Sequence, residues 1–96
     1  MATYVTLVNW TEQGVKNYKD TADRVDAANE VFAELGGRIT DIYWTLGPYD
    51  IVTLSEFPDD ESATAAALKL GAQGNVRTTT MRAFGRDEIK GIIDRT

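Results

Sequence analysis

Gly47-Pro48-Tyr49-Asp50 lies between two stretches in which apolar and polar residues alternate. Glycine tolerates positive φ, and proline fixes its own φ at about −65° while disfavouring helix at the residue before it. The Gly-Pro pair is therefore a strong turn signal. We expect a hairpin in which Arg38 to Leu46 and Asp50 to Phe57 are the two strands.

Two more strands are expected outside this hairpin. Thr3 to Asn9 alternates in a way that leaves both of its faces partly apolar. Val76 to Phe84 contains a run of threonines, and β-branched residues favour strands. The sequence therefore predicts a sheet of four strands.

Helical spacing of apolar residues runs from Thr11 to Leu35, with Thr11 placed to cap its start and Gly36-Gly37 its end. A single helix over this range would be roughly 37 Å long, more than a small sheet can cover. We therefore expect a break, followed by a longer helix that starts near Thr21.

Pro58-Asp59-Asp60-Glu61 predicts the start of a second, Ala-rich helix that runs to about Leu70. Its three carboxylates fit the positive end of a helix and do not predict a metal site, because a hard cation needs ligands that converge from several directions. Gly71 and Gly74 are candidate stops. A last short helix is expected from Arg86 to Ile93.

This order predicts one α+β domain over residues 1–96, a βαββαβ unit with a C-terminal helix. Right-handed crossovers place both main helices on the same face of the sheet. Each strand shows apolar side chains on either face, so the uncovered face is too apolar for water. We expect a second copy of the chain to cover it, as a homodimer or higher homo-oligomer, with Trp44 as an anchor.

Several blocks of the chain, in this order, resemble the GYD-domain family. They are Tyr4-Val5-Thr6-Leu7, Asn9-Trp10-Thr11-Glu12-Gln13-Gly14, Gly47-Pro48-Tyr49-Asp50, Pro58-Asp59-Asp60-Glu61, Gly74-Asn75-Val76-Arg77-Thr78-Thr79-Thr80 and Arg82-Ala83-Phe84. The resemblance implies a ferredoxin-like fold with a four-stranded antiparallel sheet. It also implies that two sheets pair face to face as a dimeric α/β barrel, and it implies no agreed activity.

The composition limits the classes of binding partner that can be expected. The 96 residues carry a formal net charge of −5, which opposes binding to DNA, RNA or an anionic membrane. No apolar run approaches the roughly 20 residues of a membrane span. Polar residues follow the first strand where a signal peptide would be apolar, so a cytoplasmic location is expected.

The chain has no cysteine and no histidine. It therefore lacks the residues for thiolate or Ser-His-Asp catalysis, for the usual zinc ligands and for a His or Cys axial ligand to haem. We expect no metal and no cofactor. Any catalysis would use carboxylates, tyrosines, lysines or arginines.

Aromatic and polar side chains near strand ends and the hairpin are the candidates for a ligand pocket. These candidates are Asn9, Trp10, Tyr43, Tyr49, Asp50, Asn75 and Arg77. Aromatic rings with a few polar groups are typical of small-molecule sites. The alternative is that the aromatics pack in the core or an interface, and that Asp50 accepts backbone N–H groups at the turn.

Three functional hypotheses follow. The first is a homo-oligomeric binding or sensory domain for a small, partly apolar metabolite. The second is a cofactor-free enzyme similar to dimeric α/β-barrel isomerases and monooxygenases, in which Asp41, Asp50 or Tyr43 moves protons. The third is a structural assembly module without a ligand.

Overall fold

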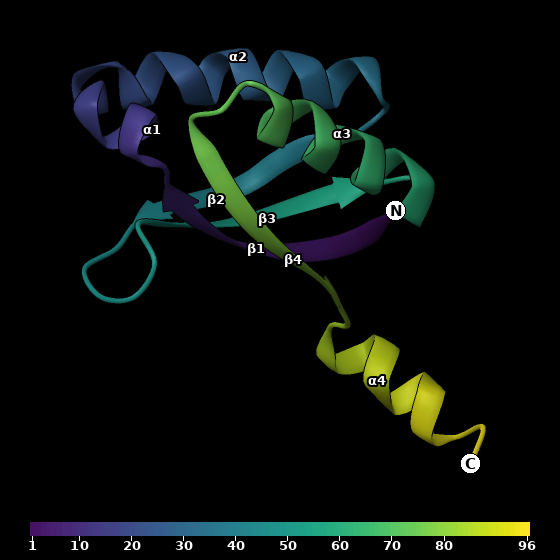
Figure 1. Cartoon of the computed structure of the whole chain (residues 1–96). Helices are drawn as coiled ribbons and strands as arrows, with labels where there is room; N and C mark the ends of the chain where they lie inside the picture. The colour runs from purple at the N-terminus through teal and green to yellow at the C-terminus, as the bar shows by residue number, and fades with distance from the viewer.

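The computed structural model describes all 96 residues and has the predicted ferredoxin-like topology. One antiparallel sheet has the strand order β2-β3-β1-β4 (Figure 1). The elements are β1 (Ala2–Trp10), α1 (Glu12–Lys16), a 3₁₀ turn (Tyr18–Asp20), α2 (Thr21–Glu34), β2 (Arg38–Trp44), β3 (Ile51–Phe57), α3 (Asp60–Ala72), β4 (Val76–Ala83) and α4 (Arg86–Ile93). No helix has both the length and the apolar character needed to span a membrane.

The predicted break in the first helical region is confirmed. The Thr11 hydroxyl caps α1 by accepting the Gly14 N–H at 3.1 Å, and α2 begins at Thr21 after the 3₁₀ turn. At the other end, Gly36 ends α2 with a φ of 79°. The chain can therefore turn back into β2 at a position where a Cβ would be strained.

The start of α3 is also as predicted, because the Asp59 carboxylate accepts the Ser62 N–H at 2.8 Å. That hydrogen bond lowers the pKa of Asp59. Gly71 does not end the helix and lies within it, and the chain turns instead at Gly74, where φ is 83°. Of these two glycines, only Gly74 needs the left-handed conformation that favours glycine.

Both main helices cover the same face of the sheet, as Figure 1 shows, and the core lies between these layers. Its buried centre consists of Tyr4, Phe32, Phe57, Ala63 and Ala66. The Phe57 ring lies 5.0 Å from that of Phe32 and 5.9 Å from that of Tyr4, measured between centroids. Aromatic contacts of this kind join α2 to the sheet.

The opposite face of the sheet has no cover within the chain. On it, Val5 lies opposite Leu54 and Met81, and Leu7 lies opposite Val52. These five apolar residues and Tyr43, which pairs with Val52, are called the open face below.

The expectation that Trp44 anchors a dimer on this face is wrong. Its indole N–H donates to the Thr21 hydroxyl at 2.9 Å, so the side chain points to α2. The reason is the alternation of the strand: Ile42 faces the helices, and Trp44, two residues on, shares that face. Tyr43 therefore takes the opposite face.

The last helix, α4, projects away from the sheet and the other helices (Figure 1). Its first turn is held by Glu88, which accepts the Gly85 N–H at 3.2 Å and pairs with Arg82 at 3.4 Å. Ile89, Ile92 and Ile93 remain exposed. An amphipathic helix with no partner in its own chain is thus attached to the domain.

The hairpin yields a test of backbone strain. Gly47 has a φ of 138° with no atom near the site of a Cβ, so Gly47→Val should cost about 1–3 kcal/mol through backbone conformation alone. Pro48→Ala should cost less than about 1 kcal/mol. Urea unfolding measures both changes.

Gly71→Ala is the matched control for this test. Gly71 lies in α3 with open space at its Cβ position, so alanine should stabilise the protein by about 0.5–1 kcal/mol. Equal effects at Gly47 and Gly71 would show that the hairpin glycine carries no strain.

Candidate functional site

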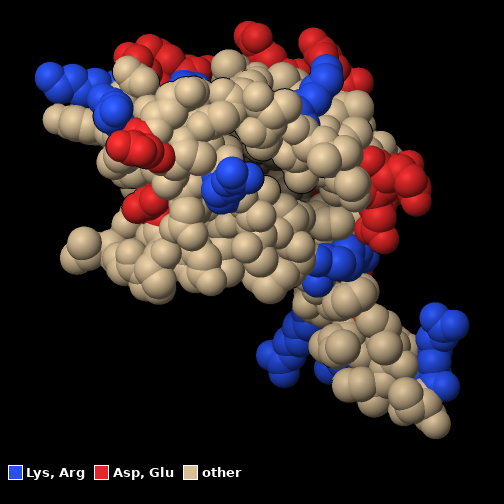
Figure 2. Space-filling model, viewed as in Figure 1, with Lys and Arg blue, Asp and Glu red and all other residues tan.

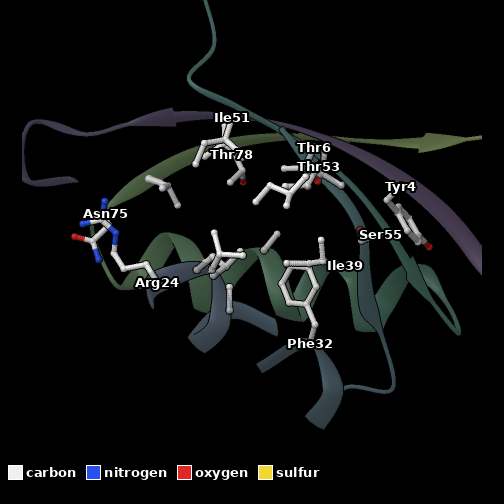
Figure 3. A pocket seen from close by; sticks show the side chains of 18 of the residues that line it. Tyr4, Thr6, Arg24, Phe32, Ile39, Ile51, Thr53, Ser55, Asn75 and Thr78 are labelled. Atoms are coloured by element: carbon white, nitrogen blue, oxygen red, sulfur yellow. The ribbon is translucent and has the colours of Figure 1, made fainter. Parts of the chain in front are cut away.

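A cavity of about 90 Å³ lies between the sheet and the two main helices (Figure 3). The sheet contributes hydroxyl-bearing side chains, among them Thr53 and Thr78, and the helices contribute small ones, among them Ala28 and Ala67. Small residues on both layers leave space that larger ones would fill. The cavity holds more than one water would need, about 10–15 Å³.

Polar side chains gather at one end of this cavity. Arg24 of α2 and Asn75, just before β4, line it there (Figure 3). Both contact Gly14: the Arg24 Nη2 donates to the Gly14 carbonyl at 3.2 Å, and a Cβ on Gly14 would lie 2.0 Å from the Asn75 carbonyl oxygen. Only glycine permits this close approach, which sets the polar end of the cavity.

Two further hydrogen bonds hold Asn75. Its side-chain Oδ1 accepts from Gln13 Nε2 at 2.9 Å, and its carbonyl accepts the Thr11 N–H at 3.1 Å. Its side-chain Nδ2 donates to no protein group. The polar end therefore presents an amide donor beside a guanidinium.

The far end of the cavity is formed by Tyr4. Its hydroxyl donates to Asp60 Oδ1 at 2.5 Å, and the Arg82 guanidinium lies 5.8 Å from the centre of its ring. Burial, with the hydrogen bond to Asp60, raises the pKa of Tyr4 from its ordinary 10.0 to about 12. Tyr4 is therefore a protonated hydrogen-bond donor near neutral pH.

Of the residues predicted to form a pocket, only Asn75 lines this cavity. Tyr43 lies on the open face, and Asn9 pairs with Arg77 near one edge of the same face. The predicted aromatic and polar set is thus divided between the two faces of the sheet and the hairpin.

The other three predicted residues meet where the hairpin contacts β1: Tyr49 and Asp50 lie in the hairpin loop, and Trp10 ends β1. The Asp50 carboxylate accepts the Trp10 N–H at 2.8 Å, and the Tyr49 carbonyl accepts from the Thr45 hydroxyl at 2.6 Å. Asp50 thus accepts a backbone N–H, which was the alternative to its contacting a ligand. The N–H belongs to the end of β1 and not to the turn. The three residues proposed for proton transfer are Asp41, Asp50 and Tyr43, and all three lie outside the cavity.

Sequence reasoning missed Arg24. A signal was present, because a cation in the first turn of a helix is placed against the helix dipole. Arg24 also precedes Ala28, a residue of the apolar stripe, by one turn. The spacing shows that both lie on one side of α2, but it does not show that the layer beneath is hollow.

The fold and cavity define a small ferredoxin-like α+β domain with a partly open cavity between its layers. The family model for the GYD domain matches residues 4–93, and the chain belongs to this family. A protein of Thermus thermophilus named "Glutamine synthetase and cystathionine beta-lyase binding protein" is 32% identical over 85 residues, 88% of this chain and 90% of the relative.

Solved structures agree with the fold. The crystal structure of TTHA0845 from Thermus thermophilus has a TM-score of 0.55 and 30% identity, and covers 88% of this chain and 95% of its own. The crystal structure of the hypothetical protein PHS023 from Pyrococcus horikoshii has a TM-score of 0.56 at 17% identity, over 90% of this chain and 93% of that chain. The second likeness concerns the fold alone.

The raised pKa of Tyr4 leads to a prediction on stability at alkaline pH. A pKa that is higher in the folded protein means that folding favours the protonated phenol, so the contribution is complete below pH 10 and is lost as the pH rises through 12. Tyr4→Phe should cost about 1–2 kcal/mol at pH 7 through the lost hydrogen bond to Asp60.

The measurement is the free energy of unfolding of wild type minus that of Tyr4→Phe, determined between pH 7 and 12. This difference should be constant up to about pH 9.5 and then shrink. A difference that is unchanged at pH 12 would contradict the assignment.

Proposed function

We propose that this protein is a homo-oligomeric domain that binds a small, partly apolar molecule in the cavity between the sheet and helices α2 and α3. The single observation that carries the proposal is the cavity itself, with apolar and hydroxyl walls and a polar end at Arg24 and Asn75. Such a combination is typical of small-molecule sites. The volume of about 90 Å³ is far below the roughly 300–1,000 Å³ of sites for drug-sized ligands, so the ligand is small.

The surface area supports self-association. The chain exposes 6,419 Å², whereas a folded monomer of 10.6 kDa exposes about 5,500 Å². The projecting α4 and the open face both contribute to the excess of about 900 Å², which is comparable to the roughly 800 Å² that each partner buries in a stable interface. The open face supplies an apolar surface for it, and pairing through this face would form the dimeric α/β barrel.

A cytoplasmic location stays a prediction.

A second candidate function is binding to another protein. The Thermus thermophilus relative is named for binding two enzymes. This chain offers the exposed isoleucines of α4 for such a contact. On the face shown in Figure 2 basic side chains flank this helix, and its first turn also carries the acidic Asp87 and Glu88. The two functions are compatible, because the cavity and α4 are separate parts of the molecule.

The oligomer is tested by light scattering after gel filtration at micromolar concentration. We expect at least twice the 10.6 kDa of one chain. Leu54→Glu should yield monomers, because it places a carboxylate in the apolar interface. Leu68→Glu is the matched control: Leu68 is exposed on α3, away from the open face, so its substitution should leave the mass unchanged. A wild-type mass of one chain would contradict self-association.

Cavity binding is tested by filling the cavity. Ala28 lines it, whereas Ala27, its neighbour on α2, is exposed. Small apolar compounds should raise the melting temperature of wild type and of Ala27→Leu, but not that of Ala28→Leu. A melting temperature that no compound in the screen raises, or one raised equally in both variants, would contradict a ligand in this cavity.

A further inference from the structure

Arg24 has an unusual environment for a charged side chain. It is half-buried at the cavity, and its only hydrogen bond within the protein goes to the neutral carbonyl of Gly14, at 3.2 Å. Four ion pairs form elsewhere in the chain, and none includes Arg24. Asp20 lies one helical turn earlier and still makes no ion pair with it. In a chain with 15 acidic and 10 basic residues, this cation therefore has no anionic partner.

The helix terminus adds to the positive potential at this place, while Asp23 in the same turn opposes it. Arg24 lies in the first turn of α2, where the helix dipole is positive. No Asp or Glu lines the cavity, and the side chains around Arg24 there are apolar or carry hydroxyl or amide groups. A half-buried guanidinium is costly without a counterion, so the site is suited to an anion that arrives from outside the chain.

Asn75 provides a second donor for the same anion. Its Nδ2 donates to no protein group, and both it and Arg24 are positioned by contact with Gly14. A carboxylate has two oxygens, which match the paired N–H groups of arginine, with an amide N–H as a further donor. One cation balances one negative charge, which favours a monocarboxylate over a phosphate.

The rest of the cavity sets the size of the ligand. An apolar cavity of about 150 Å³ accommodates benzene, and the present cavity of about 90 Å³ is smaller. Its walls away from Arg24 include Val25, Ile42 and Val76. They suit a branched or straight aliphatic tail of about three to five carbons.

We propose that the cavity binds a short-chain aliphatic monocarboxylate, with the carboxylate on Arg24 and Asn75 and the tail between the sheet and the helices. This inference rests on the proposed binding function and specifies the chemistry of the ligand. It assigns to Arg24 the role of the anion-binding residue.

The test compares acids with amides of the same shape. Isobutyrate and isovalerate, each beside its amide, are titrated into the full chain at pH 7 and followed by the methyl NMR signals of Ile42 and Val76. The acids should bind wild type at least about tenfold more tightly than the amides, since a charge-assisted hydrogen bond is lost in the amide. Arg24→Gln should weaken the acids by at least about tenfold and leave the amides within about twofold.

One further variant and the comparison of acid with amide separate the possible failures. Arg24→Lys keeps the charge without the paired donors and should bind the acids with intermediate affinity. Acid and amide that bind wild type equally well would overturn the carboxylate proposal and leave cavity binding intact. No binding of either compound to wild type would overturn both. If Arg24→Gln fails to fold, the comparison of acid with amide on wild type still decides.

Discussion

Helices α2 and α3 pack on the same face of a sheet whose inner side chains are aromatic at one end, at Tyr4 and Phe57, and include the small Thr53 and Ser55 between the layers. Right-handed crossovers fix the side, and alanines on α3 approach Thr53 and Ser55 of β3 across the interface. Large aromatic contacts close one end of this layer at Phe32 and Phe57. No comparable pair closes the other end, which leaves the cavity there. The opposite face of the sheet is uncovered because both helices lie on one side.

Local signals in the sequence were sufficient for the order of strands and helices, and the family resemblance implied the ferredoxin-like fold that the structure has. The Gly47-Pro48 turn, the cap at Thr11 and the acidic start at Asp59 each act through bonds or dihedral angles of a few neighbouring residues, and the structure has all three. Crossover handedness then determines the side of the helices. Gly71 was ambiguous because glycine is compatible with a helix as well as with its end, and α3 continues through it to Ala72.

The site could be predicted only in part. Asn75 was among the predicted pocket residues and lines the cavity, but Arg24 was not predicted, because a cavity is the volume that side chains of several elements fail to fill. Alternation showed that Tyr43 and Trp44 face opposite ways, but not which of them meets α2, and the choice of Trp44 for the dimer face was wrong. The role of Asp50 could not be decided from its neighbours in sequence. The Trp10 N–H that it accepts belongs to β1, which is far from Asp50 in the sequence but lies beside β3 in the sheet.

The proposed binding function requires an accessible space between the sheet and helices α2 and α3. Methyl NMR under xenon pressure measures this space, because xenon enters apolar cavities. We expect shifts at Ile42, Ile51 and Val76, which line the cavity, and none at Val5 and Leu54 on the open face. Unshifted signals from all three cavity residues would show that the layers close on each other and leave no space for a ligand.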